Sequence, residues 1–216
     1  MTEAEWLSCE DPDAQLVFLN GRTRDRKSRL FACACCRMVW PLLTDRRSRL
    51  AVLRLEEYAD GTRDDKRLTD IYNIANAAYI ESYRKVGCLT GSTLAARVAA
   101  FAATGWHGTA ATCAVLALEA ASGTERPITQ RLETALLRDI FGNPFRPITF
   151  SSSWRTDTAV TLARQMYESR EFSAMPILAD ALQDAGCDNE DILSHCRGPG
   201  PHVRGCWVID LVLGKE

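Results

Sequence analysis

Apolar residues recur every three or four positions along almost the whole chain, and this spacing constrains the fold more than any other feature. Strict alternation of apolar and polar residues, which is typical of half-buried strands, is scarce. The chain has 216 residues, of which 46 % are hydrophobic and 25 % charged, so it is long enough to bury a real core. We therefore predict an all-α protein, a compact multi-helix bundle of about eight to ten helices with no regular repeat.

Capping and helix-breaking residues divide the chain into predicted elements. The predicted helices span residues 12–20, 25–40, 45–60, 64–86, 129–141, 156–170, 176–185, 188–196 and 201–213. The alanine-rich stretch 92–121 is predicted to be helical, with a turn between two helices or a kink at residues 105–108, and residues 142–153 are predicted to be a loop. We expect a single helical domain over residues 1–216, or two lobes spanning 1–123 and 124–216.

The cysteines indicate a reducing compartment. The sequence has nine, an odd number, and Cys35 and Cys36 are adjacent, which does not suit a secreted disulfide framework. No basic and apolar signal segment opens the chain, so we expect reduced cysteines and a cytoplasmic location. Cys33 and Cys36 form a Cys-x-x-Cys pattern, but they lie in the middle of an apolar predicted helix, which favours packing over redox chemistry.

Histidine and cysteine gather near the C-terminal end, where His195, Cys196, His202 and Cys206 are the candidate ligands of a zinc site. Imidazole and thiolate are the ligands that zinc prefers. If Pro201 begins a helix, His202 and Cys206 lie four positions apart on one face. Adjacent side chains on a helix point about 100° apart, which disfavours joint ligation by His195 and Cys196. We favour the interpretation that the thiols are buried and the histidines cap helices, which requires no cofactor.

Positive charge is concentrated before and within the second predicted helix, although the whole chain has a net charge of −2. A cluster of this kind can bind the phosphates of a nucleic acid or another anion. It can also pair with acidic residues of the chain itself, which the isoelectric point near 6.0 favours. The candidate contact residues are Arg22, Arg24, Arg26, Lys27 and Arg29.

The sequence lacks the short motifs of the common catalytic and nucleotide-binding sites. Our first hypothesis is therefore a non-catalytic protein-interaction or scaffold module with a protein partner. The alternatives are a zinc-stabilised module that binds nucleic acid through residues 22–29, and a hydrolase or transferase that uses His195 or His202. We expect no membrane partner, because Arg97 and His107 interrupt the alanine-rich stretch.

Three stretches resemble a large family of uncharacterised bacterial proteins. They are RLFACACCR at residues 29–37, FGNPFRP at 141–147 and HCRGPGPHVRGCW at 195–207. The resemblance assigns no fold, activity, ligand or site residue. Around Trp40 the chain departs from the family, which has Arg before and His after the tryptophan.

Overall fold

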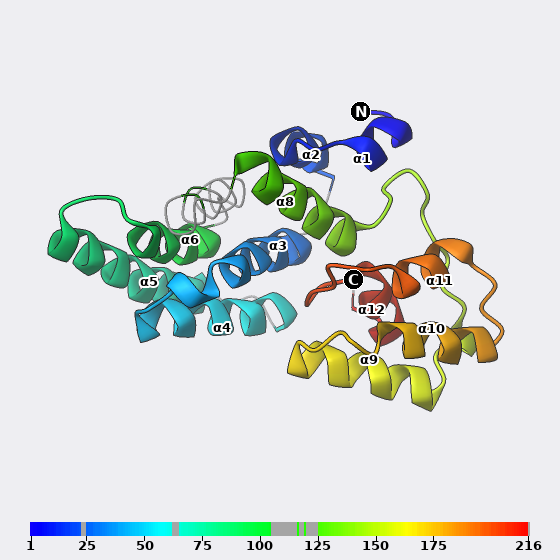
Figure 1. Cartoon of the computed structure of the whole chain (residues 1–216). Coiled ribbons are helices and arrows are strands. Elements are labelled where there is room, and N and C mark those ends of the chain that lie inside the picture. The colour runs from blue at the N-terminus through cyan, green and yellow to red at the C-terminus, as the bar shows by residue number, and fades with distance from the viewer. Residues whose placement is uncertain (23–24, 62–64, 105–115, 117–118, 120–124, 216) are drawn as a thin grey trace. The chain divides into compact units, whose positions relative to one another are not determined.

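The chain folds into helices joined by loops, as the computed structural model shows (Figure 1). The structure describes residues 1–22, 25–61, 65–104, 116, 119 and 125–215. Eleven α-helices, two short 3-10 helices and no strand occur within these residues, which confirms the predicted all-α class. Packing of the backbone separates two units, Ser8–Thr134 and Met1–Leu7 with Ala135–Glu216. The prediction of one domain, or of lobes divided near residue 123, stays a prediction.

The unit Ser8–Thr134 is built around four helices that lie side by side in Figure 1. The helix α5 packs against both α4 and α6, and α3 packs against the same two helices. Asp45 caps α4 by accepting a hydrogen bond from the backbone N–H of Arg47. The elements are α2 (Pro12–Leu19), α3 (Asp25–Met38), η1 (Trp40–Leu42), α4 (Arg46–Asp60), α5 (Asp65–Val86), α6 (Gly91–Thr104) and the first part of α8 (Arg126–Phe141).

The cysteine-rich part of α3 lies in the core of this unit. Every residue from Leu30 to Cys36 is buried, as expected for a helix that is apolar nearly all round. Burial raises the pKa of the Cys35 and Cys36 thiols, because a thiolate would lose its hydration there. The cysteines of the described residues are free thiols, which agrees with the predicted reduced state.

The second unit combines the two ends of the chain. Trp6 is fully buried, and its indole Nε1–H donates to the backbone oxygen of Gly142 at 3.1 Å. Leu178, Leu182 and Ile209 are fully buried in the apolar core of this unit. The elements are α1 (Glu3–Ser8), the end of α8, η2 (Ser152–Trp154), α9 (Asp157–Ser169), α10 (Met175–Asp184), α11 (Glu190–Arg197) and α12 (Trp207–Leu213).

The predicted helices agree with the structure to within a few residues, with two exceptions. The short helix α1 was not expected, because six residues are too few to show a periodicity. The last helix begins at Trp207 and not at Pro201. Residues 198–206 contain three glycines and two prolines and are not helical, so His202 and Cys206 do not share a helix face.

Two further expectations concern the turn at residues 105–108 and the absence of a membrane-spanning helix. The predicted turn at residues 105–108 lies outside the described residues. Among the helices that are described, none combines the length and the apolar character needed to cross a membrane.

Candidate metal centre

The last turns of α8 carry a carboxylate into a buried position. Leu136, Leu137 and Ile140 are at most 4 % exposed, and Asp139 lies among them at 2 %. The helix ends at Gly142, whose φ of +67° suits glycine. A Cβ atom at Gly142 would lie only 3.1 Å from Cγ of Trp207, so glycine is also required for close packing. The end of α8 is therefore fixed by local geometry next to Asp139.

The helix α11 supplies the first histidine. Asn189 caps it, with its side-chain oxygen accepting from the backbone N–H of Ile192 at 3.1 Å. Ile192 and Cys196 on one face of α11 are fully buried in the apolar core. His195 lies in the last turn, and its ring packs against the Trp207 indole with 5.1 Å between centroids. The apolar anchoring of α11 thus fixes the direction of the His195 side chain.

The loop of residues 198–206 supplies the other two side chains. Its turn depends on Gly200, which has a φ of +81° and where a Cβ atom would lie 3.1 Å from the backbone nitrogen of His202. The peptide bond between Gly200 and Pro201 is cis. The side chain of His202 is 8 % exposed and Cys206 is fully buried. Both side chains are thus held within the unit.

Four polar atoms from these three segments converge. Asp139 Oδ1 lies 3.1 Å from His195 Nε2 and 2.9 Å from His202 Nδ1. Cys206 Sγ lies 3.2 Å from His195 Nε2. One ligand atom from each of the four residues lies within 4.8 Å of the other three. The second carboxylate oxygen of Asp139 accepts from the backbone N–H of Val203 at 2.9 Å, which orients the carboxylate.

The electrostatics of the cluster favour a negative Asp139. Burial opposes the charge, but hydrogen bonds from His195 and His202 outweigh it and lower the pKa of the Asp139 carboxyl. The pKa of the Cys206 thiol is raised well above its usual value, first by burial and then by the nearby Asp139 charge. A bound divalent cation would reverse this effect, because a coordinating thiol loses its proton. A cation would therefore neutralise both groups at once.

The arrangement suits ligation better than nucleophilic catalysis. In a Cys-His-Asp triad, the thiol and the carboxylate interact with different nitrogens of the imidazole. Here Cys206 Sγ and Asp139 Oδ1 both face Nε2 of His195. His202 also interacts through one nitrogen only, because its Nε2 is buried and has no hydrogen-bond partner among the described residues. The nitrogen, sulfur and oxygen atoms thus point to a common centre.

The structure brings three of the four residues expected for zinc into this cluster. His195, His202 and Cys206 converge, whereas Cys196 is not among the clustered ligand atoms, and burial raises the pKa of its thiol to about 12. Asp139 takes the fourth position and was missed by the sequence reasoning. Its position among Leu136, Leu137 and Ile140 was the available signal, since a carboxylate on the apolar face of a helix needs a buried partner.

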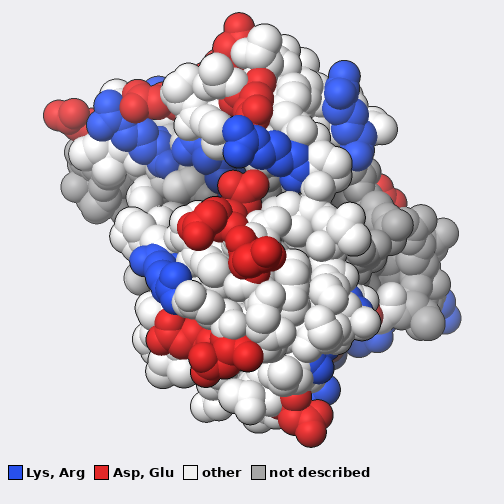
Figure 2. Space-filling view, turned by 90° about the vertical axis from the view of Figure 1, so that its right-hand side faces the viewer, with Lys and Arg blue, Asp and Glu red and all other residues white. Residues whose placement is uncertain are grey.

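The basic cluster of residues 22–29, before and within the first turns of α3, is partly occupied by contacts within its own unit. Arg26 pairs with Asp60 at 3.0 Å, while Arg22 stacks on the Phe18 ring and Arg29 on the Tyr58 ring. Lys27 is half-buried, and Arg24 lies outside the described residues. Figure 2 shows one face of the molecule, on which both basic and acidic side chains are exposed. Nucleic-acid contact by this cluster stays a prediction, and these contacts do not favour it.

Comparisons with protein-family models, with curated proteins and with solved structures gave no match. The resemblance to a bacterial family therefore stays an expectation, and the functional argument depends on the geometry of the chain itself.

Proposed function

We propose that the unit Met1–Leu7 with Ala135–Glu216 is stabilised by one zinc ion and that the chain is a non-catalytic interaction protein. The observation that carries the zinc proposal is the convergence of Asp139 Oδ1, His195 Nε2, His202 Nδ1 and Cys206 Sγ. Nitrogen, thiolate and carboxylate donors in fourfold sets are the usual ligands of Zn²⁺. Four protein ligands leave no open position for a substrate, which is typical of structural zinc sites.

Zinc would join three segments that are separate in the sequence. The end of α8, the last turn of α11 and the loop before α12 each contribute at least one ligand. The loop of residues 198–206 takes part in few backbone hydrogen bonds. Those among the described residues run from Gly198 N–H to the His195 oxygen, from Cys206 N–H to the Val203 oxygen and from Asp210 N–H to the Cys206 oxygen. Metal binding would supply the stability that this loop lacks.

The alternative is a cluster joined by protons. If His195 Nε2 and His202 Nδ1 each carry a hydrogen, both donate to Asp139 Oδ1 and satisfy the buried carboxylate without a cation. The two states differ in metal content and in the protonation of Cys206, and both differences can be measured.

The test is the zinc content of the full chain, purified without a polyhistidine tag and without chelators. We expect about one zinc per chain. Cobalt substitution should give the intense visible absorption of a tetrahedral site together with a sulfur-to-cobalt charge-transfer band. Cys206→Ala should abolish both signals. Cys196→Ala is the matched control, because it removes a buried thiol of the same unit that is not one of the four clustered ligands.

A zinc-free wild-type protein that also binds no cobalt would overturn the zinc proposal in favour of the proton-joined cluster. Equal loss of metal in the two cysteine variants would show that the ligand set is wrong. The cobalt titration of the wild-type chain remains decisive even where a variant fails to fold.

Exposed apolar side chains on α5 support the interaction part of the proposal. Ile80, Tyr83 and Val86 are 37 %, 43 % and 48 % exposed, and their spacing of three places them along one side of the helix. Exposed apolar groups of this kind often mark contact with another protein. Tyr83→Glu should abolish capture of a cross-linked partner protein, whereas Val17→Glu, which changes an exposed valine of α2, should not. Identical capture by both variants would reject this surface. The free thiols are consistent with the proposed cytoplasmic location.

A further inference from the structure

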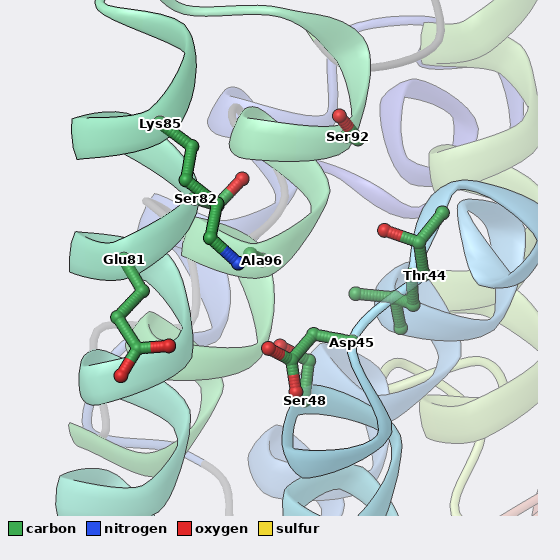
Figure 3. A pocket seen from close by; sticks show the side chains of 9 residues that line it. Thr44, Asp45, Ser48, Glu81, Ser82, Lys85, Ser92 and Ala96 are labelled. Atoms are coloured by element: carbon green, nitrogen blue, oxygen red, sulfur yellow. The ribbon is translucent and has the colours of Figure 1, made fainter.

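A polar pocket of about 260 Å³ lies where the start of α4, the end of α5 and the start of α6 meet, in the unit Ser8–Thr134 (Figure 3). Four hydroxyl side chains line it: Thr44, Ser48, Ser82 and Ser92. Its charged lining residues are Asp45, Glu81 and Lys85. The pocket is smaller than the cavities of about 300–1,000 Å³ that hold drug-sized ligands. It is suited to a molecule of a few heavy atoms.

The charges around the pocket are separated but balanced. Arg47 binds both carboxylates, with Nη2 2.8 Å from Asp45 Oδ2 and 2.6 Å from Glu81 Oε2. These hydrogen bonds are the main reason why the pKa of each carboxyl is lowered, so both are negative at neutral pH. Lys85 has no hydrogen-bond or ion-pair partner among the described residues. The two carboxylates, the guanidinium and the ammonium together carry no net charge.

One hydroxyl in the wall is unsatisfied. Ser48 is 0 % exposed, and its Oγ has no hydrogen-bond partner among the described residues. A buried hydroxyl without a partner is unfavourable, and such groups in native proteins call for an explanation. In Figure 3, Ser48 lies beside Asp45, while the Lys85 side chain reaches from α5 toward Ala96 of α6. A ligand with both donor and acceptor groups could bridge these side chains.

We propose that this pocket binds a small α-amino acid as its zwitterion. The ligand carboxylate pairs with the Lys85 ammonium and accepts from the hydroxyls, and the ligand ammonium lies against the carboxylates of Asp45 and Glu81. A zwitterion carries one positive and one negative group and so complements the opposite charges around the pocket. A simple anion would be repelled by the carboxylates, and a simple cation by the Lys85 ammonium. None of the described lining residues is aromatic, so the pocket lacks the ring on which sugars commonly stack. The small apolar contacts, Leu43 and Ala96, leave room for a short ligand side chain only.

The proposal is tested by titrating the full chain with L-serine and monitoring its backbone amide chemical shifts by NMR. Saturable shifts are expected at Asp45, Ser48, Ser82 and Ser92. Acetate and ethylamine each carry only one of the two charges and should bind at least about tenfold more weakly, because each lacks one charge-assisted contact. Glycerol tests for a neutral polyol. Failure of L-serine to shift these amides, or glycerol binding as tightly as L-serine, would overturn the proposal.

The variant that tests the role of Lys85 is Lys85→Gln, which should weaken L-serine binding about tenfold. Arg84→Gln is the matched control, because it removes the neighbouring positive charge of α5 from an exposed residue that does not line the pocket. Ser48→Ala should also weaken binding while leaving the fold intact. Equal affinity of the Lys85→Gln and Arg84→Gln variants would contradict the proposed carboxylate contact. This site is independent of the zinc proposal, since its residues all belong to the unit Ser8–Thr134.

Discussion

Two buried carboxylates on the helix α8 have opposite properties. Glu133 belongs to the unit Ser8–Thr134 and is 1 % exposed, and Asp139 belongs to the other unit and is 2 % exposed. Burial raises the pKa of Glu133 to about 8, with a further contribution from Asp13. The pKa of Asp139 is lowered, because hydrogen bonds from His195 and His202 outweigh its burial. At neutral pH, Glu133 is therefore mainly protonated and Asp139 is ionised.

The two carboxyl groups are similarly buried and differ in their hydrogen-bond partners. Oε1 of Glu133 has no hydrogen-bond partner among the described residues, whereas both oxygens of Asp139 accept hydrogen bonds. Burial alone thus favours the neutral form of a carboxyl group, whereas burial among hydrogen-bond donors favours its ionised form. A retained negative charge among imidazoles and a thiol is what a cation site requires.

The largest expected effect comes from Asp139→Asn. This variant keeps the side-chain volume but removes the charge, and we expect the unit Met1–Leu7 with Ala135–Glu216 to lose about 4 kcal/mol of stability. Urea unfolding followed by Trp fluorescence measures this loss, and zinc content should fall in parallel. The control is Asp184→Asn, which changes an exposed carboxylate of the same unit. Equal stability of the two variants would show that the Asp139 charge is not needed.

Glu133→Gln should stabilise the fold, in contrast to Asp139→Asn. The pKa of Glu133 is higher in the folded chain than the usual 4.5, so the folded chain retains a proton that the unfolded chain releases. Its contribution to stability is fully present below pH 4.5 and is lost as the pH rises to about 8. The glutamine variant has no proton to lose, and should therefore be more stable than the wild type by about 3 kcal/mol at pH 7.

The measurement for Glu133→Gln is the free energy of unfolding at several pH values from 4 to 9. The exposed residue Glu125 provides the control variant, Glu125→Gln, which should follow the wild-type curve. A wild-type curve and a Glu133→Gln curve that run parallel over this pH range would refute the assigned protonation state.

The smallest of the three effects is expected from Gly142→Ala. The substitution places a Cβ atom 3.1 Å from the Trp207 ring in a left-handed conformation, and should cost about 2 kcal/mol. Gly186→Ala separates the two causes, because Gly186 also has a positive φ but nothing lies within 4 Å of its Cβ position. We expect about half the loss for Gly186→Ala in thermal unfolding. Equal losses would mean that packing between α8 and Trp207 does not support the Asp139 cluster.

Much of the fold follows from the sequence, because its determinants are local. The caps Asp11, Asp45 and Thr156 each precede a helix and accept a backbone hydrogen bond within its first turn. Periodicity correctly indicates that α3 enters the core. The alanine-rich helix α6 also appears where expected, with most of its residues buried.

The candidate site was only partly predictable, because its fourth member is remote in sequence. His195, His202 and Cys206 stand close together along the chain, whereas Asp139 reaches them only through the packing of α8. The helical arrangement expected for His202 and Cys206 was wrong, since the glycines and prolines of residues 198–206 prevent a helix. Adjacent side chains on a helix were expected to point apart. Accordingly, His195 belongs to the cluster and Cys196 does not.

The buried indole of Trp6 has a consequence for synthesis of the chain. Residues 1–7 are made well before residues 138–142, yet they pack against them, as shown by the bonds of Trp6 to Gly142 and of Arg138 to the Trp6 backbone oxygen. The unit Ser8–Thr134 has all its residues available earlier and can fold while translation continues. Trp6 therefore cannot reach its position in the folded chain until at least residues 138–142 have been made.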